Sequence, residues 1–183
     1  MNRVAIRFEA GLKLLDNLFI KAANCTDPKE REILCSFIII KLHDQWNFRS
    51  RQIVLENYGK SETNMIEFLR SNWSRKRMGA GWEPDWHIPA NAIRAASLLG
   101  VARLADIQNA LGSVTKIDEV RWTRNAIVHN IPTSFQKYRT IVRNNYGQVG
   151  IAPHDILFLR NSASGKTIYE DWCNELTQAI SAI

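Results

Sequence analysis

The residues of this chain that could do chemistry together lie in and just before the string RNAIVHN, at positions 124–130. In a helix, successive residues turn by about 100°, so Arg121, Asn125 and His129 share one face. Arg124 starts about 140° around the helix from His129, but its long side chain can reach that face. The face then holds two guanidinium groups, an amide and an imidazole with no carboxylate beside them, which favours an anionic ligand, most simply a phosphate.

His129 would supply the proton chemistry at such a site. It falls in the last turn of the expected helix, where the helix dipole favours a protonated ring, and an imidazole changes protonation near neutral pH. Such a histidine can exchange a proton with an RNA 2′-hydroxyl or 5′-oxygen, while a nearby arginine stabilises the extra negative charge at phosphorus. The same spacing fits a helix-terminal cation beside a surface arginine, so these residues alone leave both interpretations open.

Helix-period patterning predicts the elements that must position these residues. The second expected helix opens at Asp27 and Pro28, and its length of about 45 Å is typical of the spine of a bundle. Strand candidates are too few for a sheet, so we expect an all-α fold, with 133–183 as a C-terminal helical extension. Helices are expected over 3–23, 28 to about 58, 61–72, 90–99, 103–111, 115–130, 133–145 and from about 166 onward, with a loop at 73–89 and a short strand or irregular segment at 156–160.

Composition sets the broad class of protein. The 183 residues make one domain, 1–183, and a net charge of +6 suits nucleic acid or another polyanion. Three unpaired cysteines, and the lack of a long apolar run or a signal-peptide pattern, predict a cytoplasmic protein without a membrane segment. No histidine or cysteine has metal-ligand spacing, so neither a metal nor another cofactor is expected. SASGKT at 162–167 has Arg160 where a phosphate-binding loop requires glycine, which predicts a turn.

Further cations could extend the binding surface beyond the motif. The loop at 73–89 interleaves three cations with Trp73, Trp82 and Trp86, as a platform for single-stranded RNA needs, although tryptophans also anchor loops onto a core. Cations on the long helix and after the motif helix could reach the same ligand, or could simply pack or be solvated. The candidate substrate-binding residues are Arg121, Arg49, His43, Arg75, Lys76, Arg77, Lys137 and Arg139.

The string RNAIVHN, late in a helical chain, resembles the signature of the HEPN superfamily. That signature is an arginine, usually followed by a polar residue, and then a histidine after four to six intervening residues. Arg124, Asn125 and His129 match it, and the resemblance is clearest over 115–132. It implies a helical bundle that dimerises and brings two motif copies into one cleft. It also implies metal-independent RNA cleavage to a 2′,3′-cyclic phosphate, with Arg124 and His129 catalytic and Asn125 positioning or tuning them.

The resemblance also carries expectations about biological setting. HEPN nucleases commonly act as toxins or anti-phage effectors, so an antitoxin or regulatory protein is an expected partner besides RNA and a second copy. HEPN toxins silenced by a nucleotidyltransferase antitoxin tend to carry a tyrosine two places after the histidine, where this chain has Ile131. Many HEPN domains are inactive, so the alternative function is a non-catalytic helical module that binds nucleic acid or a protein partner.

Overall fold

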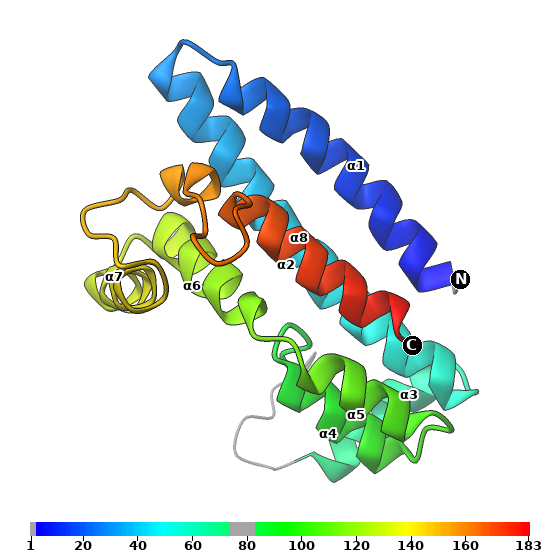
Figure 1. Ribbon diagram of the computed structural model, residues 1–183. Helices are drawn as coiled ribbons and strands as arrows, with labels where there is room; N and C mark the ends of the chain where they lie inside the picture. The colour runs from blue at the N-terminus through cyan, green and yellow to red at the C-terminus, as the bar shows by residue number, and fades with distance from the viewer. Residues whose placement is uncertain (1–2, 74–82) are drawn as a thin grey trace.

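Helices make up all the regular structure of the described part of the chain, residues 3–73 and 83–183, which confirms the all-α prediction (Figure 1). In this computed structural model, two long antiparallel helices, α1 and α2, form the spine on which the shorter helices pack. The elements are α1 (Arg3–Ala23), α2 (Pro28–Tyr58), α3 (Glu62–Asn72), α4 (Pro89–Leu99), α5 (Leu104–Gly112), α6 (Lys116–His129), α7 (Pro132–Tyr146), the 3₁₀ helix η2 (Asp155–Phe158) and α8 (Ile168–Ser181).

The long helix α2 begins and ends where local sequence signals predict. The Asp27 carboxylate accepts a hydrogen bond from the Lys29 amide at 2.8 Å, with Pro28 at the first helical position. The helix ends at Gly59, whose φ of 72° lies in the left-handed region. The segment expected to be a short strand or irregular instead forms η2, followed by one isolated bridge between Arg160 and Thr167.

Residues after the motif helix belong to the same packed core as those before it. α8 lies along the spine and packs against α1, α2, α5 and α6, so it is not a separate appendage (Figure 1). Its buried face includes Trp172, Leu176 and Ile180, each fully inaccessible to solvent. No helix in the described residues is both long enough and apolar enough to cross a membrane.

The motif helix α6 packs against α2, α7 and α8. Ile117 and Val120 are buried on its inner face, as the apolar pattern predicts, but Val128 is 43% exposed and does not join that face. Asn130, with a left-handed φ of 46°, ends the helix and turns the chain into α7. This turn leaves His129 exposed at the end of α6.

A buried carboxylate holds α6 to its neighbours. Glu119 is only 4% exposed, and its oxygens accept hydrogen bonds from Trp172 Nε1 of α8 at 2.8 Å and Asn145 Nδ2 of α7 at 2.8 Å. Lys116 Nζ donates from one turn earlier at 2.9 Å, and the Tyr146 hydroxyl also donates. Four donors from three helices therefore converge on one charged group, which sets how α6 is rotated against α7 and α8.

We expect Glu119→Gln to lower the free energy of unfolding by about 3 kcal/mol, because an amide cannot accept from all four donors and leaves some of them buried and unpaired. Urea unfolding followed by circular dichroism measures the change. The control is Asp106→Asn, which removes an exposed ion pair with Arg103 and should change stability by about 0.5 kcal/mol or less. Equal losses in the two variants would contradict the role given to Glu119.

Candidate functional site

Arg124 contacts both of the other motif residues. Its Nη1 lies 3.2 Å from Nε2 of His129 and donates to Oδ1 of Asn125 at 3.1 Å. A guanidinium can only donate, so Nε2 of His129 is the acceptor. A hydrogen bond at this contact requires the tautomer with its proton on Nδ1. The long side chain of Arg124 does reach around the helix to His129, as the helical geometry predicts.

The second arginine of the motif helix is not free of negative charge. Arg121 Nη2 lies 2.9 Å from Oδ1 of Asp118, one turn earlier on α6. The expectation of a helix face without a neighbouring carboxylate is therefore wrong for Arg121, and the i, i+3 spacing of the pair could have shown this from the sequence. Asp118 is exposed, so water weakens its effect on the arginine.

Two histidines from outside the motif come to the same region. His43 of α2 is 8% exposed, and its ring centre lies 4.7 Å from that of His87, which precedes α4. Burial lowers the pKa of His43 to about 3, and His87, Arg124 and Arg121 lower it in the same direction. Burial also lowers the pKa of His87, where Arg121 and Arg124 oppose protonation and the nearby Asp85 favours it. Both rings are thus neutral at neutral pH.

A set of contacts to α2 holds His87 in place. Trp46 Nε1 donates to the His87 backbone carbonyl at 3.1 Å. Trp86 is 2% exposed, and its Nε1 donates to the Glu83 carboxylate at 2.9 Å. Glu83 in turn accepts from Arg51 of α2 at 2.7 Å. Of the two roles considered for the loop tryptophans, Trp86 takes that of an anchor to the core. Arg75, Lys76, Arg77 and Trp82 lie outside the described residues.

His87 was missed as a site residue because its sequence position gives no signal. It lacks metal-ligand spacing, and no fixed spacing connects it to His43 or to the motif. The described residues include no cluster of three or more histidine, cysteine or acidic side chains that could hold a metal ion. Its contact with His43 follows only from the packing of 83–88 onto α2.

Two of the candidate cations lie elsewhere. Arg49 is 9% exposed and donates to the Arg7 carbonyl of α1 at 3.4 Å. It stands about 120° around α2 from His43, so it faces α1 and does not join the motif. Lys137 lines a shallow depression with Trp122 and Asn145, on a different side of α7 from Arg139.

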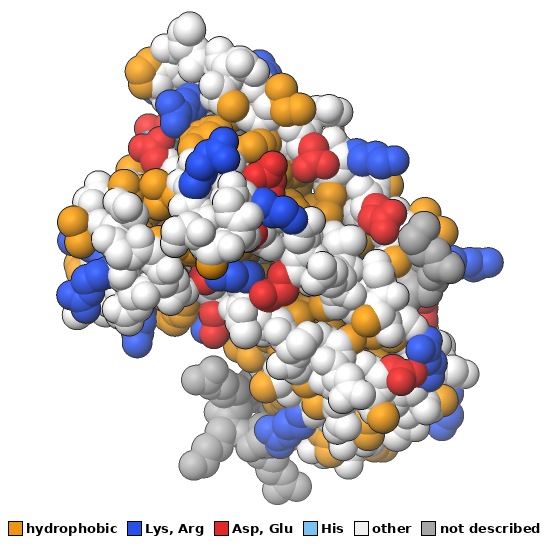
Figure 2. Space-filling model, in the orientation of Figure 1, with side chains coloured by type: hydrophobic (Ala, Val, Ile, Leu, Met, Phe, Trp, Pro, Cys, Tyr) orange, Lys and Arg blue, Asp and Glu red, His pale blue; other side chains and the backbone are white. Residues whose placement is uncertain are grey.

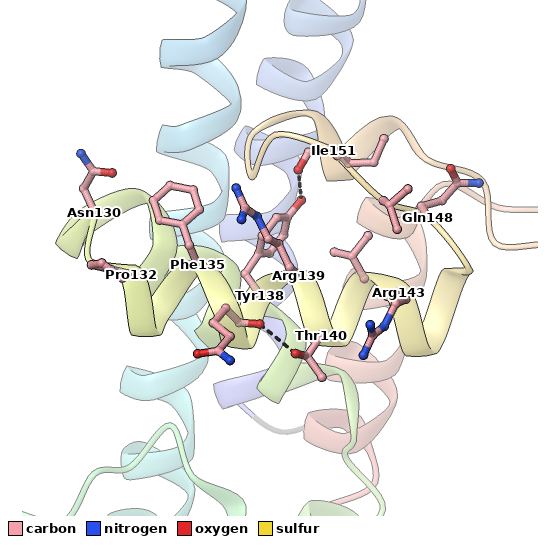
Figure 3. Close-up of a pocket in the computed structure, with 13 residues that line it drawn as sticks. Asn130, Pro132, Phe135, Tyr138, Arg139, Thr140, Arg143, Gln148 and Ile151 are labelled. Atoms are coloured by element: carbon pink, nitrogen blue, oxygen red, sulfur yellow. Dashed lines mark hydrogen bonds between the residues drawn. The ribbon is translucent and has the colours of Figure 1, made fainter.

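A groove of about 660 Å³ lies between α7 and residues 148–151, and Asn130 at one end adjoins His129 (Figure 3). Arg139 and Arg143 line it, and the Arg139 guanidinium lies 6.0 Å from the Phe135 ring centre. The Tyr138 hydroxyl donates to the carbonyl of Ile151 at 3.2 Å and so fixes the opposite wall. The sequence of α7 contains no acidic residue, and Lys and Arg side chains stand out at the α7 edge of Figure 2. The groove thus combines positive charge with apolar surface.

We expect the neutrality of His43 to make stability depend on pH. Its folded pKa of about 3 lies below the ordinary value of 6.5. As the pH falls below 6.5, His43 becomes protonated in the unfolded chain but stays neutral in the folded protein, so the unfolded state is favoured. This residue alone should lower the free energy of unfolding by up to about 1.4 kcal/mol per pH unit. In urea titrations between pH 7 and 4, His43→Gln should therefore lose stability less steeply than the parent. Ser50→Ala, at a buried and non-titrating site on the same helix, should keep the parental slope. Parallel pH profiles for His43→Gln and the parent would refute this account.

Comparison of the chain with protein-family models, with curated proteins and with solved structures finds no match in any of the three.

Proposed function

We propose that this protein is a metal-independent endoribonuclease of the HEPN type. The observation that carries the proposal is the contact between Arg124 and His129 at the exposed end of α6. It puts a permanent positive charge and an imidazole within 3.2 Å of each other, where a polymer can reach them. Cleavage of RNA by its own 2′-hydroxyl needs a base for that hydroxyl and a cation for the phosphate, and these two side chains match those needs.

The groups of the motif divide the reaction among them. Nε2 of His129 takes the proton of the 2′-hydroxyl, and the 2′-oxygen attacks phosphorus. The bond from phosphorus to the 5′-oxygen breaks, and a 2′,3′-cyclic phosphate forms. Arg124 turns from His129 to a non-bridging phosphate oxygen and stabilises its charge. Asn125, which accepts from Nη1 of Arg124, orients that guanidinium. In a shared cleft, the protonated His129 of a second copy gives the leaving 5′-oxygen its proton.

Exposed apolar side chains near the motif support the second copy. Ile33, Phe37 and Phe48 of α2 are 61%, 42% and 48% exposed, and they fall within an arc of about 60° on that helix. Next to His129 in the chain, Val128 and Ile131 are 43% and 47% exposed. A homodimer that buries these side chains, Val128 and Ile131 beside His129 included, would bring two copies of the motif together.

The groove beside α7 gives the RNA strand a path away from the motif. Arg139 and Arg143 can contact its phosphates, while Phe135 offers a surface for a base. The net charge of +6 favours the same ligand. In this proposal the protein acts in the cytoplasm as a toxin or anti-phage effector under the control of an antitoxin or regulatory protein. That setting is supported by the resemblance of the motif alone.

We expect the purified protein to cleave RNA in the presence of EDTA and to leave 2′,3′-cyclic phosphate ends. Arg124→Ala and His129→Ala should each slow cleavage by about 10³-fold, since each removes a group that acts on the reacting phosphate. His154→Ala, beside Glu32 and Asp155, should cleave at the parental rate. Undiminished cleavage by His129→Ala would show that the base lies elsewhere. RNA binding without cleavage would favour the non-catalytic module.

We expect Phe37→Glu to convert a dimer into a monomer and to abolish cleavage, because it places a charge in the apolar contact. Size-exclusion chromatography with light scattering gives the mass, and the RNA assay gives the activity. Leu98→Glu changes an exposed apolar residue on α4 and should leave both measurements unchanged. A parent protein that is monomeric while it cleaves RNA would exclude the composite site.

A further inference from the structure

Three buried nitrogen atoms around the two-histidine pair have no hydrogen-bond partner among the described residues. They are Nδ1 of His43, Nε of Arg121 and Nε of Arg124. Leaving a buried polar group unpaired costs about 1–3 kcal/mol, so such groups are uncommon in folded proteins. Both guanidinium nitrogens are N–H donors, which makes an anion the ligand that would satisfy them.

The same residues lie within electrostatic reach of one another. The His43 and His87 rings lie 4.7 Å apart, and Arg121 and Arg124 each lower the pKa of both, so the four side chains from α2, α6 and the segment before α4 lie near one another. We call these four residues the α2–α6 cluster. Its position is fixed from both sides, by the buried His43 and by the hydrogen bond of Trp46 to the His87 carbonyl.

Carboxylates lie at the rim of the cluster. Asp44 Oδ1 is 3.8 Å from Nδ1 of His43, beyond hydrogen-bond distance, and Asp118 pairs with Nη2 of Arg121. Asp85 is exposed beside His87. Asp44 and Asp118 are more than half exposed, and neither forms a hydrogen bond with any of the three unpaired nitrogens.

We propose that the α2–α6 cluster is a second phosphate site, which holds a phosphate of the RNA strand next to the one that is cleaved. Arg121 and Arg124 contact the phosphate oxygens, and His87, the less buried of the two histidines, donates to them. The identity of the strand as RNA rests on the proposed function, but the site itself suits any tetrahedral oxyanion. Arg124 belongs both to the motif site and to the α2–α6 cluster, because its Nη1 contacts His129 while its Nε is unpaired.

Phosphate binding at this site has a consequence that a surface cation would not produce. Without an anion, burial lowers the pKa of both imidazoles, and the two arginines lower it further. An anion placed between them offsets that repulsion and favours the protonated form of His87, helped by Asp85 and Asp118. Binding should therefore draw a proton onto the protein near neutral pH.

Sulfate is a suitable probe, because it is a tetrahedral dianion that does not itself titrate near neutral pH. Histidine ring signals of the full chain are followed by NMR as sulfate is added at pH 6.5, with chloride keeping the ionic strength constant. We expect saturable shifts at His87 and a rise of about one unit in its pKa, and no saturable shift at His154. His87→Gln and Arg121→Gln should each weaken sulfate binding about tenfold. Shifts at His129 alone, or equal shifts at His154, would overturn the proposal.

A second arm separates this proposal from the nuclease itself. An RNA analogue with 2′-deoxy sugars is bound to the protein in a calorimeter, in buffers with different heats of ionisation. Proton uptake by the parent and its loss in His87→Gln are expected. The second site would be refuted if His87→Gln cleaved RNA at the parental KM and the parent took up no proton on binding the analogue. That outcome would leave the proposed nuclease activity intact. Sulfate binding at His87 without any RNA cleavage would support an oxyanion site and refute the nuclease.

Discussion

The buried Glu119 carboxylate is the interaction on which the site depends most. A charge taken out of water is tolerated only if donors surround it, and here they come from α6, α7 and α8. Since Glu119 lies in the same helix as Arg121, Arg124 and His129, fixing its rotation also fixes which way those side chains leave α6. A buried carboxylate thus determines the direction of the motif side chains at the surface.

The site is organised around unequal environments for similar groups. His129 stands exposed at the end of α6 and accepts from Arg124, whereas His43 is buried and His87 half-buried behind the same arginine. Burial and the two arginines keep the inner pair neutral, so the three imidazoles of the site cannot play the same part. One accessible imidazole and one shielded pair therefore offer two different environments to a ligand.

In a single copy of the chain, the motif lies at the exposed end of α6. His129 ends a helix, and exposed apolar side chains stand on α2 and beside the motif. The groove along α7 leads away from the same end. The motif residues, the exposed apolar side chains and the groove therefore lie on α6, its neighbour α2 and the following helix α7.

Local sequence determined the helices and the central contact of the motif. Apolar spacing, the Asp27 cap and Gly59 depend on residues within a turn or two, and Arg124 reaches His129 within one helix. Tertiary structure alone decided which partners these side chains meet.

The direction of Arg49 depends on where α1 packs, and the groove depends on the hydrogen bond from the Tyr138 hydroxyl to the Ile151 carbonyl. His87 joins His43 because Trp46 holds its backbone. Periodicity reports which face a residue occupies on its own helix, but the partner across that face is set by how distant segments pack.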